Sequence, residues 1–156
     1  MTNGGYRRIF VGISGSLSSF TALHRAVELA RRSDAELHAV LATAPGIHTV
    51  DHIQLEQSMA ARLLASILES AFGADGCPPD VSFSAHSVLG GAGPILTQMA
   101  DRENDLIVIG AARRRRLPDF STMRYCTTHA ACPVLVVPTP ALPKMSPAIR
   151  LGIRER

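Results

Sequence analysis

Four consecutive arginines, Arg113 to Arg116, have the clearest chemistry in this chain. Their guanidinium groups stay charged and donate several hydrogen bonds in a planar fork, an arrangement that suits phosphate and carboxylate groups. Ser121 and Thr122 follow, just before a short helical pattern, and anions are stabilised at the N-terminus of a helix. These residues predict a site for a small anion. The alternative is a solvated loop that holds no ligand.

A serine-rich turn, Ser14 to Ser19, follows the first apolar run. We expect Ser18 or Ser19 to cap the helix that begins there. The turn is similar to the phosphate loop of ATP pyrophosphatases, but Ser16 replaces a glycine and Ser18 replaces the acidic residue of that loop. The G-x-S-x-G pattern of serine hydrolases also fails, because Ser16 occupies the last glycine. We therefore expect no catalytic residue and no enzyme.

The histidines and cysteines give little support for a metal site. His48 and His52 are four residues apart, but no cysteine or carboxylate follows at a matching spacing. The three cysteines, Cys77, Cys126 and Cys132, are an odd number without metal-ligand spacing, so a disulfide framework is not expected. Cys132 is expected to be a small buried residue.

Five short apolar runs alternate with helical periods. With the first run at the centre, this alternation predicts a single three-layer, doubly wound α/β domain. Its parallel sheet would have the order 3-2-1-4-5, flanked by about four helices, with Pro94 as the first residue of the third helix. The expected strands are Ile9 to Ile13, Leu37 to Leu41, Val81 to Val88, Leu106 to Ile109 and Val134 to Val137.

Such a sheet binds ligands beyond the carboxyl ends of its strands, at the point where the strand order reverses. In this chain that point lies between Ser14 and Gly110. The four arginines begin three residues after Gly110, so the predicted anion site lies at the same edge of the sheet.

The composition of the chain argues against several classes of function. The chain has 156 residues, 46% of them hydrophobic, which suits one domain: residues 1–140, followed by a Pro-rich basic extension over residues 141–156. The net charge is +3, but aromatic residues make up only 4% and there is no Trp, so no nucleic acid is expected as a partner. No apolar run suits a membrane span and no secretory signal is expected, so the expected location is the cytoplasm.

Two strings near the C-terminus resemble the universal stress protein family. Asp105 to Gly110, and then His129 to Val137, are similar to the family's D-L-I-V-x-G and H-A-x-C-P-V-L-V-V strings. Further support comes from Ser19 to Ala30 and from Gly93-Pro94, so the resemblance extends from about Arg7 to Pro138. It implies a fold of the adenine nucleotide alpha hydrolase type.

Many members of that family bind ATP through a G-x2-G-x9-G-[S/T] motif, and this chain departs from it. Gly110 matches the first glycine, the second falls on Arg113, and the third falls on Phe120, before Ser121. Ser14 stands at the position after the first strand where the family has an acidic residue. The resemblance thus implies weak or absent ATP binding at a modified site. The resemblance also implies that about Ala42 corresponds to the position that contacts adenine from the second strand. The expected ligand-binding residues are Ser14, Ala42, Gly110, Arg113, Ser121 and Thr122.

Three hypotheses follow from these observations. The first is a non-enzymatic stress-response sensor or regulator that acts as a homodimer, joined through the edge strand Val134 to Val137. The second is a relative that holds ATP or another adenine nucleotide through the arginine-rich loop. The third is an ATP-cleaving enzyme of the pyrophosphatase type, which would need a magnesium ligand at the edge of the sheet.

Overall fold

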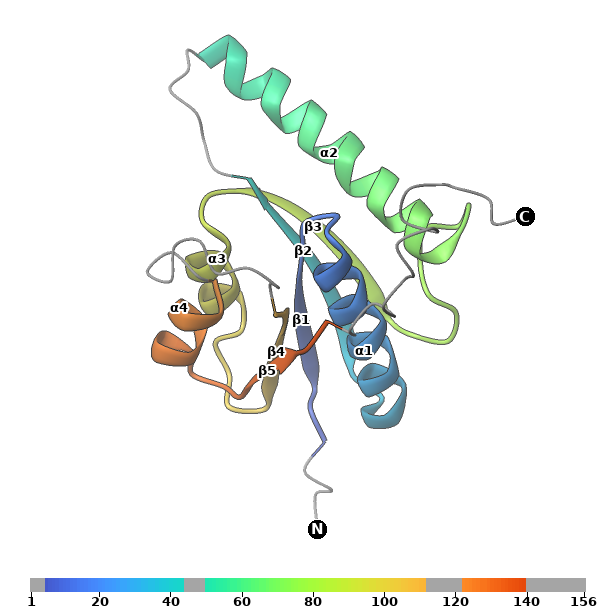
Figure 1. Ribbon diagram of the computed structural model, residues 1–156, viewed down its shortest axis with the longest axis vertical. Coiled ribbons are helices and arrows are strands. Elements are labelled where there is room, and N and C mark those ends of the chain that lie inside the picture. Colours follow the sequence, from blue (N-terminus) through green and yellow to red (C-terminus); the bar gives the residue numbers. More distant parts are fainter. Residues whose placement is uncertain (1–4, 44–49, 112–121, 140–156) are drawn as a thin grey trace, which may run out of the picture.

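The computed structural model describes residues 5–43, 50–111 and 122–139, and of residues 50–53 only the backbone. Within these residues, five strands form one parallel sheet in the order β3-β2-β1-β4-β5 (Figure 1). The predicted strand order is therefore confirmed. The strands are β1 (Arg8–Ile13), β2 (Glu36–Thr43), β3 (Phe83–Leu89), β4 (Asp105–Gly110) and β5 (Val134–Val137).

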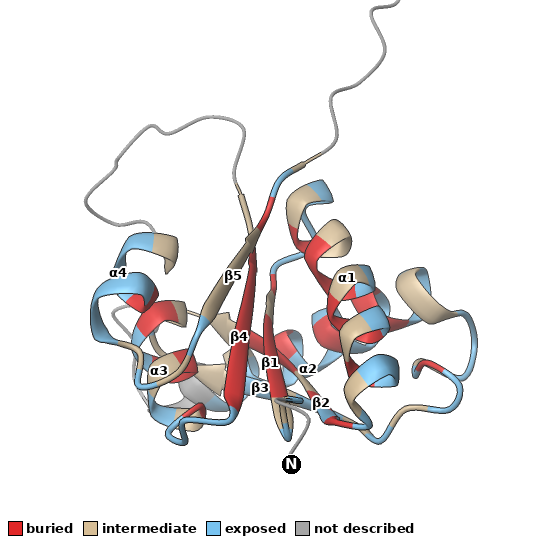
Figure 2. Ribbon diagram, turned by 90° about the horizontal axis from the view of Figure 1, so that it is seen from below, coloured by how far each residue is buried: buried red, intermediate tan, exposed pale blue. Residues whose placement is uncertain are grey.

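Helices cover both faces of the sheet, as the alternation of strands and helical periods predicts. The helices are α1 (Leu17–Ser33), α2 (Val50–Phe72), α3 (Ala92–Met99) and α4 (Thr122–His129). Figure 2 shows α3 and α4 on one side of the sheet and α1 on the other. The first turns of α2 extend beyond the carboxyl edge of the sheet (Figure 1).

Two cores lie on the two faces, because successive residues of a strand point to opposite sides. On the side of α1 and α2, Ile9, Val11 and Leu37 are fully buried. On the side of α3 and α4, Ile107 and Leu96 are fully buried. The central strands β1 and β4 are buried along most of their length (Figure 2). Burial on both faces explains why these strands read as continuous apolar runs.

One predicted helix start is wrong. The α3 helix begins at Ala92, with Gly91 as its N-cap, so Pro94 is its third residue and not its first. Proline is tolerated there because the first N–H groups of a helix have no partner within the helix. The periodicity of the side chains marks the helix correctly but does not fix its first residue.

A partly buried ion pair joins β1 to β4 at the amino edge of the sheet. Arg8 Nε donates to Asp105 Oδ1 at 2.8 Å and Arg8 Nη2 donates to Asp105 Oδ2 at 2.6 Å, while the Asp105 side chain has no exposed surface. The backbone N–H of Arg102 donates to Asp105 Oδ2 at 3.0 Å. The hydrogen bond with Asp105 raises the pKa of Arg8 above its usual range. Asp105 therefore has a structural partner and lies at the end of the sheet opposite to the predicted ligand edge.

Candidate functional site

The carboxyl edge of the sheet brings Ser14, Ala42 and Gly110 together. In the β1–β2 register Ile13 pairs with Leu41, so the next residues along the two strands, Ser14 and Ala42, are neighbours. Strand β4 is the other neighbour of β1, and it ends at Gly110. The half-buried Ala42 packs against the core on the side of α3. These three predicted site residues thus lie at one edge of the sheet.

The other predicted site residues are placed only in part. Thr122 is the first residue of α4 and is half-buried. Arg113 and Ser121 lie outside the described residues, as do Phe120 and the arginines at positions 114–116. The arginine contribution to the site therefore stays a prediction.

The serine-rich turn after β1 forms a chain of hydroxyl groups. Ser14 Oγ lies 3.0 Å from Ser16 Oγ, and Ser16 Oγ lies 3.1 Å from Ser18 Oγ. Ser14 and Ser16 are exposed and Ser18 is half-buried. The hydroxyls lie at the N-terminus of the 17-residue helix α1, whose first turn contains no acidic residue. This arrangement favours an anion through hydrogen bonds and the helix dipole.

The capping residue of α1 differs from the sequence prediction. Ser16 is the N-cap and accepts a hydrogen bond from the Ser19 N–H at 3.3 Å, so the assignment to Ser18 or Ser19 is wrong. Gly15, with φ +79°, turns the chain so that Ser16 immediately precedes the first helical residue. The Ser19 side chain is buried instead, where its hydroxyl donates to the Ser16 carbonyl at 3.0 Å and accepts from the Ser14 N–H at 3.1 Å.

This cap gives a testable stability effect. We expect Ser16→Ala to lower the free energy of unfolding by about 1 kcal/mol, because the Ser19 N–H loses its acceptor. Ser18→Ala is the matched control, since its hydroxyl contacts Ser16 Oγ but does not cap the helix. Urea denaturation of both variants measures the difference. Equal midpoints for the two variants would contradict the assignment of the cap.

Gly110 fixes this turn against the end of β4. A Cβ atom added at Gly110 would lie 2.1 Å from the backbone oxygen of Ser18 and 2.5 Å from its carbonyl carbon. Only glycine leaves room for this approach of strand to helix. Beyond Gly110, the Ala111 N–H donates to the Val137 carbonyl at 2.8 Å, and Thr139 Oγ1 donates to the Ala111 carbonyl at 2.8 Å. Gly110 therefore holds the end of β4 close to the start of α1.

Metal and thiol chemistry find no support in the described part of the chain. That part contains no group of three or more histidine, cysteine or acidic side chains placed to hold a metal ion. His48 and the side chain of His52 lie outside the described residues. The three cysteines are free thiols. Burial raises the pKa of Cys126 to about 11, which keeps this thiol protonated at neutral pH. Cys132, expected to be buried, is only half-buried and packs against the core beside α3.

Sequence analysis missed one pair of polar side chains outside this edge. His38 of β2 and His86 of β3 approach each other, with Nδ1 of His38 3.0 Å from Nε2 of His86. The two residues are 48 positions apart, and only the pairing of β2 with β3 brings them together. From the sequence, the alternation of residues along the two strands was the signal that could have suggested this contact.

No helix within the described residues is both long and apolar enough to cross a membrane.

Comparison with known proteins gives a consistent family match. The model of the Universal stress protein family matches residues 5–138. Universal stress protein Slr1101 from Synechocystis sp. is 40% identical over 65 residues, which are 39% of this chain and 60% of that protein. The match thus spans less than two thirds of that relative.

Solved structures show the same fold. A universal stress protein in complex with cAMP superposes with a TM-score of 0.67 at 24% identity, covering 87% of this chain and 99% of that one. A universal stress protein family protein from Arabidopsis thaliana, with AMP bound, gives a TM-score of 0.58 at 18% identity, covering 86% and 93%. At these identities the likeness establishes the fold.

Proposed function

Because the chain belongs to the universal stress protein family, we propose that it is a non-enzymatic regulator that binds a small phosphate-type anion at the carboxyl edge of its sheet. The chain of hydroxyls formed by Ser14, Ser16 and Ser18 at the start of α1 carries this proposal. Gly110 adds to it, since it ends β4 at the same edge and approaches the backbone of Ser18 closely.

This site is less suited to recognise a nucleoside than to bind a phosphate group. A carboxylate after the first strand can accept hydrogen bonds from ribose hydroxyls, whereas Ser14 has a neutral hydroxyl that already contacts Ser16. Ala42 presents only a methyl group at the neighbouring position. We therefore propose that phosphate affinity is retained while the usual ATP affinity of the family is weak or absent.

Two alternatives differ from this proposal in specific features. Retention of an adenine nucleotide is favoured by the cAMP and AMP complexes of the two solved relatives and by Gly110. An ATP-cleaving enzyme would need a carboxylate to hold magnesium. The turn from Ser14 to Ser19 contains none, and neither does the first turn of α1.

We also propose that the protein acts as a homodimer joined through β5, and that it works in the cytoplasm. Strand β5 is one edge of the sheet, and its residues Val134, Leu135 and Val136 are only half-buried within one chain. An apolar edge of this kind favours pairing with another strand. Pro138 follows directly and limits how far the pairing extends.

Titration calorimetry with inorganic phosphate, AMP and Mg-ATP tests the anion site. We expect phosphate to bind, and the double variant Ser14→Ala/Ser18→Ala to weaken this binding about a hundredfold, since each of the two hydroxyls contributes about 1.5 kcal/mol to a charged ligand. Arg113→Ala/Arg114→Ala should weaken it as well. Thr21→Ala is the control, because its hydroxyl donates to Leu17 O one turn further along α1.

Two results would contradict the proposal. One is a phosphate response that none of these variants changes. The other is micromolar Mg-ATP binding that depends on Ser14, which would favour the nucleotide-binding alternative.

A further inference from the structure

Strand β3 is the second edge of the sheet, and it is longer and less protected than β5. It pairs with β2 through seven consecutive residues, Phe83 to Leu89, and with no other strand among the described residues. Ser84, Ala85 and Ser87 are exposed. The outward-facing N–H and C=O groups of β3 are therefore available for pairing with another strand.

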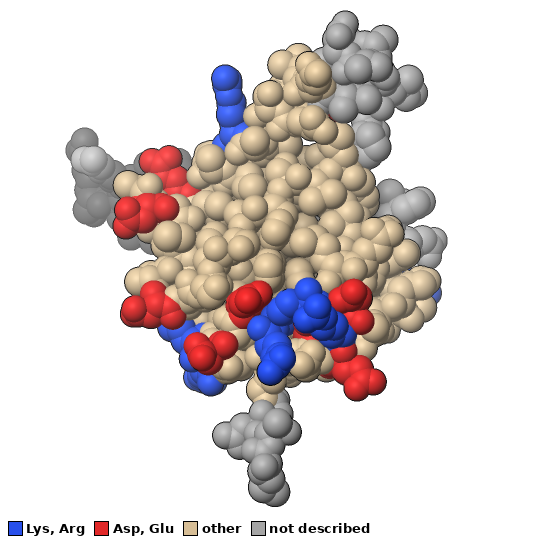
Figure 3. All heavy atoms as spheres, turned by 180° about the vertical axis from the view of Figure 1, so that it is seen from behind, with Lys and Arg blue, Asp and Glu red and all other residues tan. Residues whose placement is uncertain are grey.

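The edge also lacks the features that normally prevent such pairing. The chain has no charged residue from position 81 to position 100, and β3 itself contains no proline. Its register with β2 is continuous and has no bulge. Seen from behind, where β3 lies, the centre of the surface carries no charged side chain, and the charges gather mainly along the lower rim (Figure 3). Long, uncharged edge strands are the ones that associate.

We propose that β3 pairs antiparallel with β3 of a second copy of this chain, with His86 on the two-fold axis. A two-fold axis at His86 places Phe83 opposite Leu89 and Ala85 opposite Ser87 of the other copy, so on this face apolar residues meet apolar ones and small residues meet small ones. On the other face, Ser84 lies opposite Val88 on either side of His86. Both partners are neutral along the whole contact, so pairing brings no like charges together. A symmetric interface is also the usual form of a homodimer.

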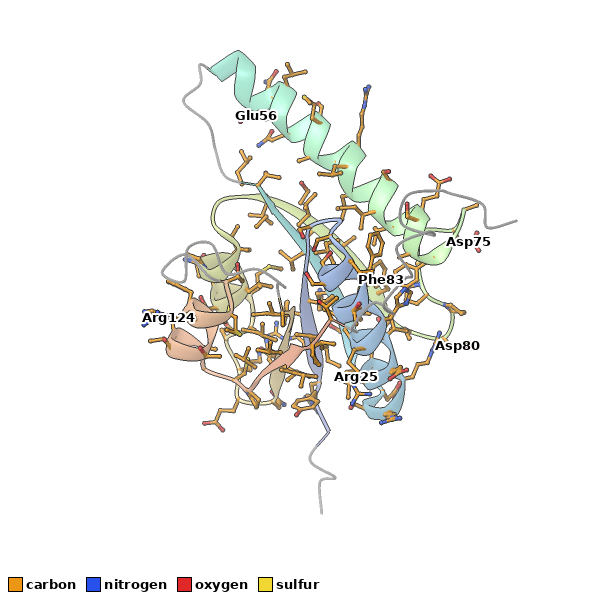
Figure 4. The ribbon with its side chains drawn as sticks, in the orientation of Figure 1. Arg25, Glu56, Asp75, Asp80, Phe83 and Arg124 are labelled. Atoms are coloured by element: carbon orange, nitrogen blue, oxygen red, sulfur yellow. The ribbon has the colours of Figure 1, made fainter. Side chains whose placement is uncertain are left out.

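The packing of Phe83 holds one end of this interface in a fixed position. Phe83 packs beneath α2, with its ring 5.8 Å from the ring of Phe72 in an edge-to-face arrangement (Figure 4). It thus joins the core on the α1 and α2 side while its backbone remains at the edge. A fixed aromatic residue at this end holds β3 in register before a partner arrives.

His86 makes the proposed interface sensitive to pH. His86 stacks on His38, which stacks in turn on Phe10, and Glu36 Oε2 lies 3.5 Å from Nε2 of His38. Arg8 lies over the Phe10 ring, 5.1 Å from its centroid, and is held by Asp105 and Asp101. The nearby helix α3 adds no charged residue.

Desolvation and the neighbouring His38 lower the pKa of His86, so His86 is neutral at pH 7. In acid, two protonated imidazoles would face each other across the axis. Pairing should therefore be strongest at neutral pH and weaken as the pH falls below the pKa of His86. Replacing His86 with Asn should remove most of this pH dependence.

Disulfide trapping tests the register. In a Cys77→Ser background, His86→Cys places two thiols directly opposite each other, and we expect a covalent dimer under mild oxidation. Ser84→Cys is the matched control, because residue 84 lies opposite residue 88 of the other copy. Its two thiols would be separated by four residues along the strands, about 13 Å. Equal trapping at both positions, or trapping at neither, would overturn the proposal.

Light scattering of the uncross-linked protein gives an independent test. Ala85→Lys puts a charge on the exposed edge. It should halve the molar mass if only β3 pairs, and should reduce a larger assembly to a β5-linked dimer if β5 pairs as well. The same charge in β5, Val136→Lys, tests the other edge. If Val136→Lys dissociates the protein and Ala85→Lys leaves its mass unchanged, the dimer uses β5 alone and the β3 proposal fails. Circular dichroism confirms that each variant is folded.

Discussion

Gly110→Ala is expected to lower the free energy of unfolding by about 3 kcal/mol, the upper end of the usual cost of overpacking. The added methyl group would lie 2.1 Å from the backbone oxygen of Ser18, which is much closer than two non-bonded atoms approach. A side chain could rotate away from such a contact, but a backbone carbonyl in the first turn of α1 can move only with the helix. The end of β4 and the start of α1 must therefore separate.

Gly91→Ser is the matched control for this change. A Cβ atom at Gly91 makes ordinary contact with Pro94 Cδ at 3.4 Å, and serine is a favoured residue at the N-cap of α3. We expect its stability to equal or exceed that of the wild type. Urea denaturation measures both variants. A Gly110→Ala protein as stable as Gly91→Ser would show that Gly110 is not held against α1.

Arg8→Ala should also be severely destabilising, by about 3–5 kcal/mol. The change removes two hydrogen bonds from a carboxylate without exposed surface, and Asp105 keeps only the bond from the Arg102 N–H. A buried charge without its partner costs far more than the pair contributes when it is intact.

The double variant Arg8→Met/Asp105→Asn separates the cost of the unpaired buried charge from the contribution of the intact ion pair. It removes both charges and leaves an amide oxygen to accept from the Arg102 N–H, so we expect it to recover much of the lost stability. Arg25→Ala is the control for loss of a surface charge (Figure 4). Arg25 Nη1 lies 2.9 Å from Glu28 Oε2 on the outside of α1, and such pairs contribute less than about 0.5 kcal/mol. Thermal unfolding of the three variants gives their order of stability. Similar losses for Arg8→Ala and Arg25→Ala would contradict it.

The sequence was sufficient to predict the fold for a physical reason. Strands β1 and β4 are buried on both faces, so their apolar runs are unmistakable, and the helical stripes between them allow only a parallel sheet with crossovers. The family resemblance pointed the same way. The string that begins at Asp105 now has a structural explanation, since this aspartate holds Arg8 at the amino edge.

Local details depended on contacts that spacing does not reveal. Several serines of the turn were equivalent candidates for the cap, and the positive φ of Gly15 selects Ser16. The first glycine of the nucleotide motif, Gly110, has a packing role that follows from its distance to Ser18, a residue 92 positions away. The contact between His38 and His86 likewise requires the register of β2 with β3.

The content of nucleotide in the purified protein tests the central claim most directly. Protein isolated without added ligand is denatured, and the released nucleotides are separated and measured against the protein concentration. The account predicts far less than one adenine nucleotide per chain, together with a phosphate response in solution, because Ser14 and Ala42 offer no carboxylate to a nucleoside. A content close to one ATP or AMP per chain would contradict it and establish this edge of the sheet as a nucleotide site.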